Sequence, residues 1–175
     1  GSIVIKENKE YAEKISYIQN AVGAIPSPFD CYLLIRSIKT LSVRMKQHNE
    51  NAIVVSNFLT NHSKINKVFF PGIDERYKEI AAKQMDGFGG MMSFILDTNI
   101  DGVKSFLKNL NIFTLAESLG GVESLIEHPA IMTHASIDPA IREKLGISDT
   151  LLRISVGIED VEDLIADLDQ ALSKI

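Results

Sequence analysis

The chain has 175 residues, of which 45% are hydrophobic and 23% are charged, and its net charge is −5 at neutral pH. This composition is typical of one globular domain, or of a small domain that carries a piece of another. The negative charge and the scattered basic residues exclude an electrostatic nucleic-acid-binding surface, and no apolar run approaches the roughly 18–20 residues of a membrane-spanning helix.

The first 60 residues are predicted to be mainly helical. A short strand is expected at 2–5, followed by a helix over about 7–20 and a stretch broken by glycine and proline. Apolar side chains at helical spacing predict a helix over 29–47. A further helix over about 49–60 is expected to continue it after a bend.

From residue 46 onward, predicted strands and helices alternate. Strands are expected at 67–70, 91–96, 114–117 and 151–156. Helices are expected at 76–83, 101–109 (capped by Asp101), 138–145 and from 159 to the end. This order predicts a small α/β sandwich with helices on one face. Residues 1–45 hold too little strand to stand alone, so we interpret them as a remnant of a larger domain and 46–175 as the small α/β domain.

Arg153 is the strongest single candidate for a binding residue. It lies in the middle of an aliphatic predicted strand, so its guanidinium group either points to solvent or meets an acid. The planar fork of arginine suits bidentate binding of a carboxylate. The pattern alone favours a solvent-exposed arginine.

The segment Glu117-Ser118-Leu119-Gly120-Gly121 follows a predicted strand. Its glycines permit a tight turn and the close approach of a ligand. Taken by itself, however, the motif favours a plain turn.

Other site classes find little support in the sequence. The four histidines lack metal-ligand spacing, so no metal site is expected. Cys31 is the single cysteine, which excludes an intramolecular disulfide and makes a reducing cytoplasm the natural location.

Four segments, in order and spacing, resemble the C-terminal part of the pyridoxal-phosphate (PLP) enzymes of cysteine and methionine metabolism. They are QNAVGAIPSPFDCYLLIRSIKTLSVRMKQHNENA at 19–52, GFGGMMSF at 87–94, AESLGGVESLIEHPAIMTH at 116–134 and LLRISVGIED at 151–160. Their sequences are similar to those of the cystathionine γ-synthase and γ-lyase group. The resemblance implies the C-terminal α/β domain of a fold-type I transferase, preceded by a piece of the large PLP-binding domain.

The resemblance also implies roles for individual residues. Arg153 corresponds to the arginine that binds the α-carboxylate of the amino-acid substrate. Ser118 corresponds to a serine that helps to position that carboxylate and the cofactor lysine, and Glu117 is implied near the distal part of the substrate. Thr133 is implied near the same pocket, although Ile131 stands where the family usually has serine.

The lysine that such enzymes need is missing from the sequence. The family holds PLP as a Schiff base on a lysine in an S-x-T-K context, and that lysine also moves the protons of the reaction. None of the thirteen lysines here has this context, and Ser37-Ile38-Lys39-Thr40 has the wrong order. We therefore assign no catalytic residue, and expect that the chain alone neither binds PLP covalently nor turns over.

Three interpretations follow. The first is the C-terminal portion of an enzyme that performs γ-replacement or γ/β-elimination on cystathionine or O-acyl-homoserine substrates. Its partners would be a small amino acid, the missing N-terminal half and further copies of itself. The second is a stand-alone, non-catalytic half that binds amino acids or a partner chain. The third is a small α/β ligand-binding or regulatory domain that uses Arg153 for carboxylates. The sequence does not distinguish a synthase, a lyase or a sulfhydrylase as the parent.

Overall fold

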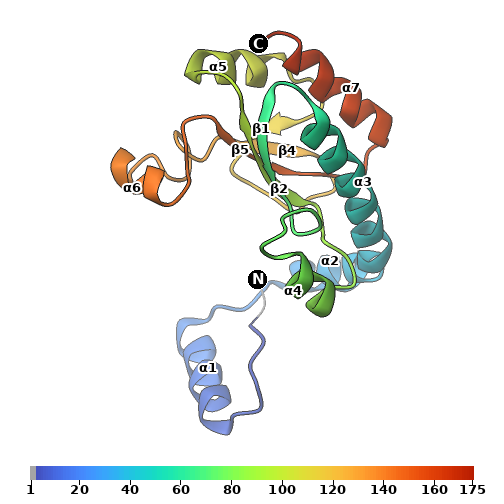
Figure 1. Cartoon of the computed structure of the whole chain (residues 1–175). Coiled ribbons are helices and arrows are strands. Elements are labelled where there is room, and N and C mark those ends of the chain that lie inside the picture. The colour runs from blue at the N-terminus through green and yellow to red at the C-terminus, as the bar shows by residue number, and fades with distance from the viewer. Residues whose placement is uncertain (1–2) are drawn as a thin grey trace. The chain divides into compact units, whose positions relative to one another are not determined.

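The computed structural model describes residues 3–175, which divide into two compact units between Leu41 and Ser42. The first unit holds two helices, and the second holds a sheet and the remaining helices (Figure 1). The assignment of residues 1–45 to a larger domain stays a prediction.

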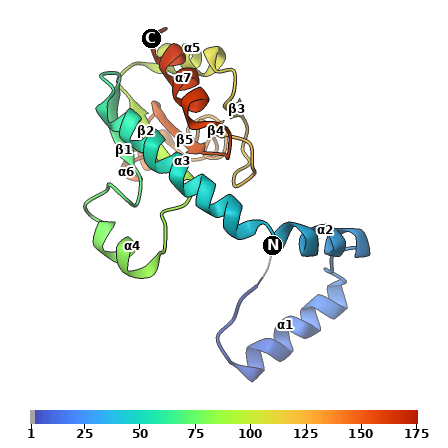
Figure 2. The same ribbon diagram turned by 90° about the vertical axis from the view of Figure 1, so that its right-hand side faces the viewer.

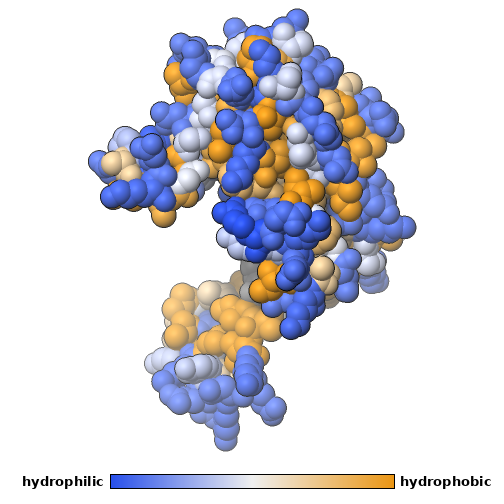
Figure 3. All heavy atoms as spheres, viewed as in Figure 1, coloured by the Kyte–Doolittle hydropathy of each residue, from blue (hydrophilic) through white to orange (hydrophobic). Residues whose placement is uncertain are grey.

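The first unit consists of α1 (Lys9–Val22) and α2 (Pro28–Ile38). The Ser27 hydroxyl and the Asp30 carboxylate form a capping box at the start of α2. Neither helix contains a buried residue, and apolar side chains lie exposed on this unit, as the lower part of Figure 3 shows. The strand predicted at 2–5 is wrong over residues 3–5, which have no regular structure, and Ser2 lies outside the described residues.

The long helix α3 spans Leu41–Asn61 without the bend that was predicted near residue 48. The break falls earlier, at residues 39–40, where the Thr40 amide and hydroxyl both donate to the carbonyl of Ser37. His48 and Asn49 remain helical because their side chains bond to backbone groups elsewhere in the second unit and do not compete for the helix backbone.

The second unit is built on a five-stranded mixed sheet with the order β1-β2-β5-β4-β3. The strands are β1 (Ile65–Phe69), β2 (Met91–Leu96), β3 (Thr114–Leu115), β4 (Leu125–Glu127) and β5 (Leu151–Ser155). All neighbours pair antiparallel except β3 and β4, which are parallel. Four of these strands were predicted, whereas β4 was missed.

Helices α3, α5 (Ile100–Asn109) and α7 (Val161–Leu172) cover one face of the sheet. Figures 1 and 2 show α3 and α7 side by side across the strands. The predicted α/β sandwich with helices on one face is thereby confirmed. The core combines the apolar sides of these helices with alternate strand residues: Ala52, Val55, Leu59, Val103, Phe106, Leu164, Leu168, Leu172, Met92, Phe94, Ile126, Leu152 and Ile154.

Two short helices complete the unit, α4 (Lys78–Gln84) and α6 (Pro139–Lys144). Asp138 caps α6, with its carboxylate accepting from the amide of Ala140. At α5 the cap lies two residues earlier than predicted. Asn99 accepts from the first-turn amides, so Asp101 lies inside the helix.

The two edges of the sheet are irregular or short. On β1 the pairing register shifts between Ile65 and Lys67, and at the other edge β3 has only two residues, both exposed. Regular, fully paired sheet is confined to the centre, where β2, β5 and β4 lie.

Candidate functional site

The face of the sheet opposite the core carries a row of polar side chains at its centre. The strand register places Ser93 of β2, Arg153 of β5 and Glu127 of β4 directly beside one another. Residues paired across strands project from the same face, so these three side chains form one cross-strand row.

Glu127 and Arg153 form an ion pair at the end of this row. The Nη2 group of Arg153 contacts Oε2 of Glu127, whose side chain is 1% exposed, while that of Arg153 is 27% exposed. A carboxylate buried to this degree needs a charged partner, because an isolated ion in the interior is strongly unfavourable. The sequence left open whether Arg153 meets solvent or an acid, and the structure places it against an acid.

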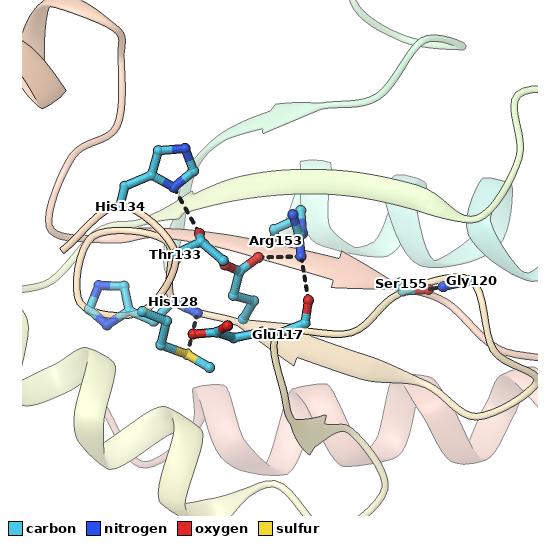
Figure 4. Close-up of polar contacts among 9 residues, drawn as sticks. Glu117, Gly120, His128, Thr133, His134, Arg153 and Ser155 are labelled. Carbon is cyan, nitrogen blue, oxygen red and sulfur yellow. Dashed lines mark hydrogen bonds and ion pairs between the residues drawn. The ribbon is translucent and has the colours of Figure 1, made fainter. Parts of the chain in front are cut away.

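The segment after β4 folds back over Glu127. The amide of Met132 donates to the carbonyl of His128 (3.1 Å), and the amide of His134 donates to that of Pro129 (2.9 Å). These turns return the Thr133 hydroxyl to Oε1 of Glu127, to which it donates. The Thr133 hydroxyl and the Arg153 guanidinium therefore contact different oxygens of this carboxylate, and Figure 4 shows His134 next to Thr133.

The loop between β3 and β4 lies over β5 and is held there by two hydrogen bonds (Figure 4). The amide of Gly120 donates to Oγ of Ser155 (2.8 Å), and Nη2 of Arg153 donates to the carbonyl of Glu117 (3.3 Å). Gly120 adopts φ = 77°, a left-handed conformation that favours glycine. The loop is therefore a supported turn beside Arg153.

The far end of the same loop is anchored by a carboxylate. Both oxygens of Glu159 accept from Ser124, one from its amide (2.6 Å) and one from its hydroxyl (2.9 Å). The Ser124 hydroxyl also accepts from the amide of Gly157 (2.8 Å). The chain around 117–124 is thus fixed at both ends against the segment that follows β5.

The four residues predicted from the sequence gather around this site, but they use different groups. Arg153 pairs with an acid, Glu117 accepts through its backbone carbonyl, and Thr133 is bonded to Glu127. Among residues 3–175, no hydrogen bond involves the Ser118 side chain, which is exposed.

Glu127 is the residue that the sequence analysis missed. It ends the three-residue strand β4, whose apolar neighbours Leu125 and Ile126 gave no alternating pattern. Only the pairing of β4 with β5 places its carboxylate opposite Arg153. A strand assignment at 125–127 would have supplied that signal.

Next to the site, His128 is buried and its Nε2 lies 2.9 Å from the carbonyl oxygen of Asp149. Burial lowers the pKa of His128 from its ordinary value, more strongly than that carbonyl raises it. Within the described residues no group of three or more histidine, cysteine or acidic side chains could hold a metal ion. In the same range no helix has the length and apolar character needed to cross a membrane.

Comparisons with known proteins agree with this architecture. The family described as Cys/Met metabolism PLP-dependent enzyme matches residues 1–173. A cystathionine gamma-lyase of Dictyostelium discoideum is 53% identical over 173 residues, and a cystathionine beta-lyase of Coxiella burnetii is 51% identical over 173 residues. Each alignment covers 98% of this chain and 45% of the relative, so the chain spans less than half the length of either enzyme.

The fold is also found in solved structures. Two structures of cystathionine gamma synthase from Xanthomonas oryzae pv. oryzae, one in complex with aminoacrylate and cysteine and one with cystathionine, superpose with a TM-score of 0.91 at 46% identity. The superposition covers 97% of this chain and 44% of the synthase. The sequence and the fold thus lead to one conclusion: the chain belongs to the family of PLP-dependent enzymes of cysteine and methionine metabolism.

Proposed function

We propose that this chain supplies the substrate-carboxylate wall of a PLP-dependent enzyme that performs γ-replacement or γ/β-elimination on cystathionine or O-acyl-homoserine substrates. The observation that carries the proposal is which nitrogens of the Arg153 guanidinium have partners. Both of its described partners, Glu127 and the carbonyl of Glu117, contact Nη2. Within the described residues, Nη1 and Nε make no hydrogen bond or ion pair, so their N–H groups remain for a substrate carboxylate.

The ligands of the similar synthase support this substrate class. Cysteine, cystathionine and aminoacrylate, which are bound in those structures, each carry a carboxylate next to the carbon that bears nitrogen. A guanidinium with free N–H groups recognises this shared group independently of the rest of the substrate. Specificity for the distal part of the substrate would then depend on other residues.

Ser118 and Glu117 are the candidates for further substrate contacts. The exposed Ser118 hydroxyl lies in the loop that Arg153 and Ser155 hold over β5, and it has no hydrogen bond within residues 3–175. It can donate to a carboxylate oxygen at Arg153. The Glu117 side chain is exposed at the start of the loop, where it can meet a distal amino group.

The family cofactor, pyridoxal phosphate, needs a lysine for its Schiff base, and the residues of this chain do not fit that requirement. Among residues 3–175 no lysine is buried, and the half-buried Lys64 lies next to β1, at the edge of the sheet. A Schiff-base lysine is normally held in a shielded site. We therefore propose that the cofactor lysine lies outside these 175 residues.

The partners follow from the same proposal. The relatives are more than twice as long as this chain, so we propose that a PLP-binding portion completes the site. The exposed apolar side chains of the first unit, including Ile3, Tyr17 and Phe29, favour burial in an assembly that includes further copies of the chain.

The test uses the protein expressed from its complete gene, with cystathionine and an O-acyl-homoserine as substrates. Arg153→Ala is expected to lower kcat/KM by about 10- to 100-fold, because a charge-assisted hydrogen bond to the substrate is lost. Arg76→Ala is the matched control, since Arg76 is also paired with an acid, Asp74, but lies far along the chain near α4. Wild-type kcat/KM in Arg153→Ala would disprove the proposal, as would an absence of any turnover in the wild-type protein.

A further inference from the structure

We propose that Glu127 is a positioning residue that orients Arg153 for carboxylate binding, and that the Thr133 hydroxyl holds Glu127 in place. The inference rests on the proposed function, because it assumes that Arg153 receives the substrate carboxylate. It differs from the expectation for Thr133, which the resemblance placed near the substrate pocket.

The first support is the cost of burying Glu127. Its side chain is 1% exposed, and Arg153 is its charged partner across the strands. An arginine side chain on a strand has many rotamers, and fixing it is entropically unfavourable. A buried carboxylate at a fixed register position selects the rotamers that reach it. The guanidinium is thereby held at Nη2 while the N–H groups of Nη1 and Nε stay unbonded.

The second support is the division of the Glu127 oxygens between two partners. Oε1 accepts from Thr133, and Oε2 pairs with Arg153. The hydroxyl on Oε1 fixes the rotation of the carboxylate group and leaves Oε2 for the guanidinium. Without this hydroxyl both oxygens would be available to Arg153, which could then turn its whole fork to Glu127 in a bidentate pair.

The third support is the direction of the hydrogen bonds beyond Thr133. Nδ1 of His134 lies 2.8 Å from Oγ1 of Thr133. A hydroxyl has one proton, and that proton is donated to Glu127. Nδ1 of His134 must therefore be the donor, which fixes its tautomer. The chain of donors runs in one direction, from His134 through Thr133 to Glu127.

A competing role for Glu127 has the opposite consequence. If Glu127 only neutralised Arg153, its carboxylate would compete with the substrate carboxylate for the same guanidinium. Removing its charge would then strengthen carboxylate binding. The positioning role predicts weaker binding, so the sign of the change separates the two roles.

The experiment measures binding of L-alanine and L-alaninamide by calorimetry to the protein expressed from its complete gene. The two probes differ only at the α-carboxylate. Glu127→Gln is expected to weaken L-alanine binding about tenfold and to leave L-alaninamide unchanged. Thr133→Val should weaken L-alanine binding to a smaller extent. Thr133→Ser keeps the hydroxyl and should bind L-alanine as the wild type does.

Asp167→Asn is the control for a loss of stability alone, since Asp167 is a buried carboxylate on α7 that caps backbone amides on the core side. Its ratio of affinities for the two probes should equal that of the wild type. If Glu127→Gln does not fold, Thr133→Val tests the positioning role in its place, because this substitution leaves the charges of the buried ion pair unchanged.

Three results would overturn the inference: unchanged or tighter L-alanine binding in Glu127→Gln, equal weakening of both probes, or no rescue by Thr133→Ser. Arg153→Ala separates this failure from that of the proposed function. If Arg153→Ala abolishes the preference for L-alanine and Glu127→Gln does not, only the positioning role fails. If Arg153→Ala keeps the preference, the carboxylate role of Arg153 fails and the positioning role fails with it.

Discussion

Arg153 is tied both to the stability of the fold and to the proposed binding of substrate, and substitutions can separate the two. Arg153→Met leaves the buried Glu127 carboxylate without a charged partner. The expected loss of stability is below the roughly 3–5 kcal/mol of a fully buried broken pair, because the guanidinium is 27% exposed.

Adding Glu127→Gln to Arg153→Met should restore most of the lost stability, since no unpaired charge then remains in the interior. Carboxylate binding should not return. Chemical denaturation and calorimetry on the single and double variants would check both expectations. A double variant that is no more stable than Arg153→Met would contradict the assignment of the pair as buried.

The lowered pKa of Asp167 predicts that the stability of the fold depends on pH. Burial alone would raise its pKa, but the backbone amides of Ile112, Asn111 and Phe113 together with the Gln170 amide outweigh burial, so its pKa lies below the ordinary value. A carboxyl group with a lowered folded-state pKa stabilises the fold above its unfolded pKa of about 3.9, and this contribution is lost as pH falls through the folded pKa.

Asp167→Asn should therefore lower the free energy of unfolding at pH 7 by about 2 kcal/mol, the order of a lost charge-assisted hydrogen bond. The difference from the wild type should shrink as pH falls below about 4, because the carboxyl of the unfolded chain is protonated there and that of the folded chain follows at lower pH. Thermal unfolding at pH 7 and pH 3 measures both differences. A gap of equal size at the two pH values would show that the charge of Asp167 is not the cause.

At the scale of elements, the loop between β3 and β4 depends on β5 for its position. Ser155→Ala removes the acceptor of the Gly120 amide (2.8 Å) and should increase hydrogen exchange at 117–121. The amides of β2 and β5 should keep their protection, because the ladder is unchanged. Ser173→Ala, at the exposed end of α7, is the matched control. Unchanged exchange at 117–121 would mean that the Arg153 contact alone holds the loop.

The strands and helices differ in how well the sequence predicts them. β2 and β5 were predicted because each is a run of five or six mainly apolar residues. β4 was missed because all three of its residues are buried and proline follows two residues later, so no period is visible. The continuity of α3 depends on His48 and Asn49 bonding to distant backbone groups, which local pattern does not contain. The candidate site was therefore only partly predictable: Arg153 was identified from its place in a strand, whereas Glu127 needed the pairing of two strands.

For the whole molecule, the two units are expected to differ in stability. Every member of the core lies in Ser42–Ile175, and α1 and α2 contain no buried residue. Isolated helices of about 12–15 residues or fewer are marginal in water. A polypeptide of residues 42–175 should therefore unfold with nearly the same midpoint as the whole chain, by circular dichroism. A much lower midpoint would show that the first unit contributes to the core.

A second whole-molecule expectation concerns the cofactor. After incubation with PLP and borohydride reduction, the 175-residue chain should show no stable PLP adduct at a single lysine by peptide mass spectrometry. The protein from the complete gene should carry one adduct, on a lysine outside these residues. A single modified lysine within the chain would contradict the proposed location of the Schiff base.

The irregular edges of the sheet have a consequence for assembly. An exposed, regular edge strand can add a strand from another molecule and start aggregation. Here the register shift and Lys67 interrupt β1, and β3 offers only two residues, so neither edge is a good template. Copies of the chain that come together should therefore do so through side chains and not through a continuous intermolecular sheet, and concentrated solutions should resist amyloid-type fibre formation.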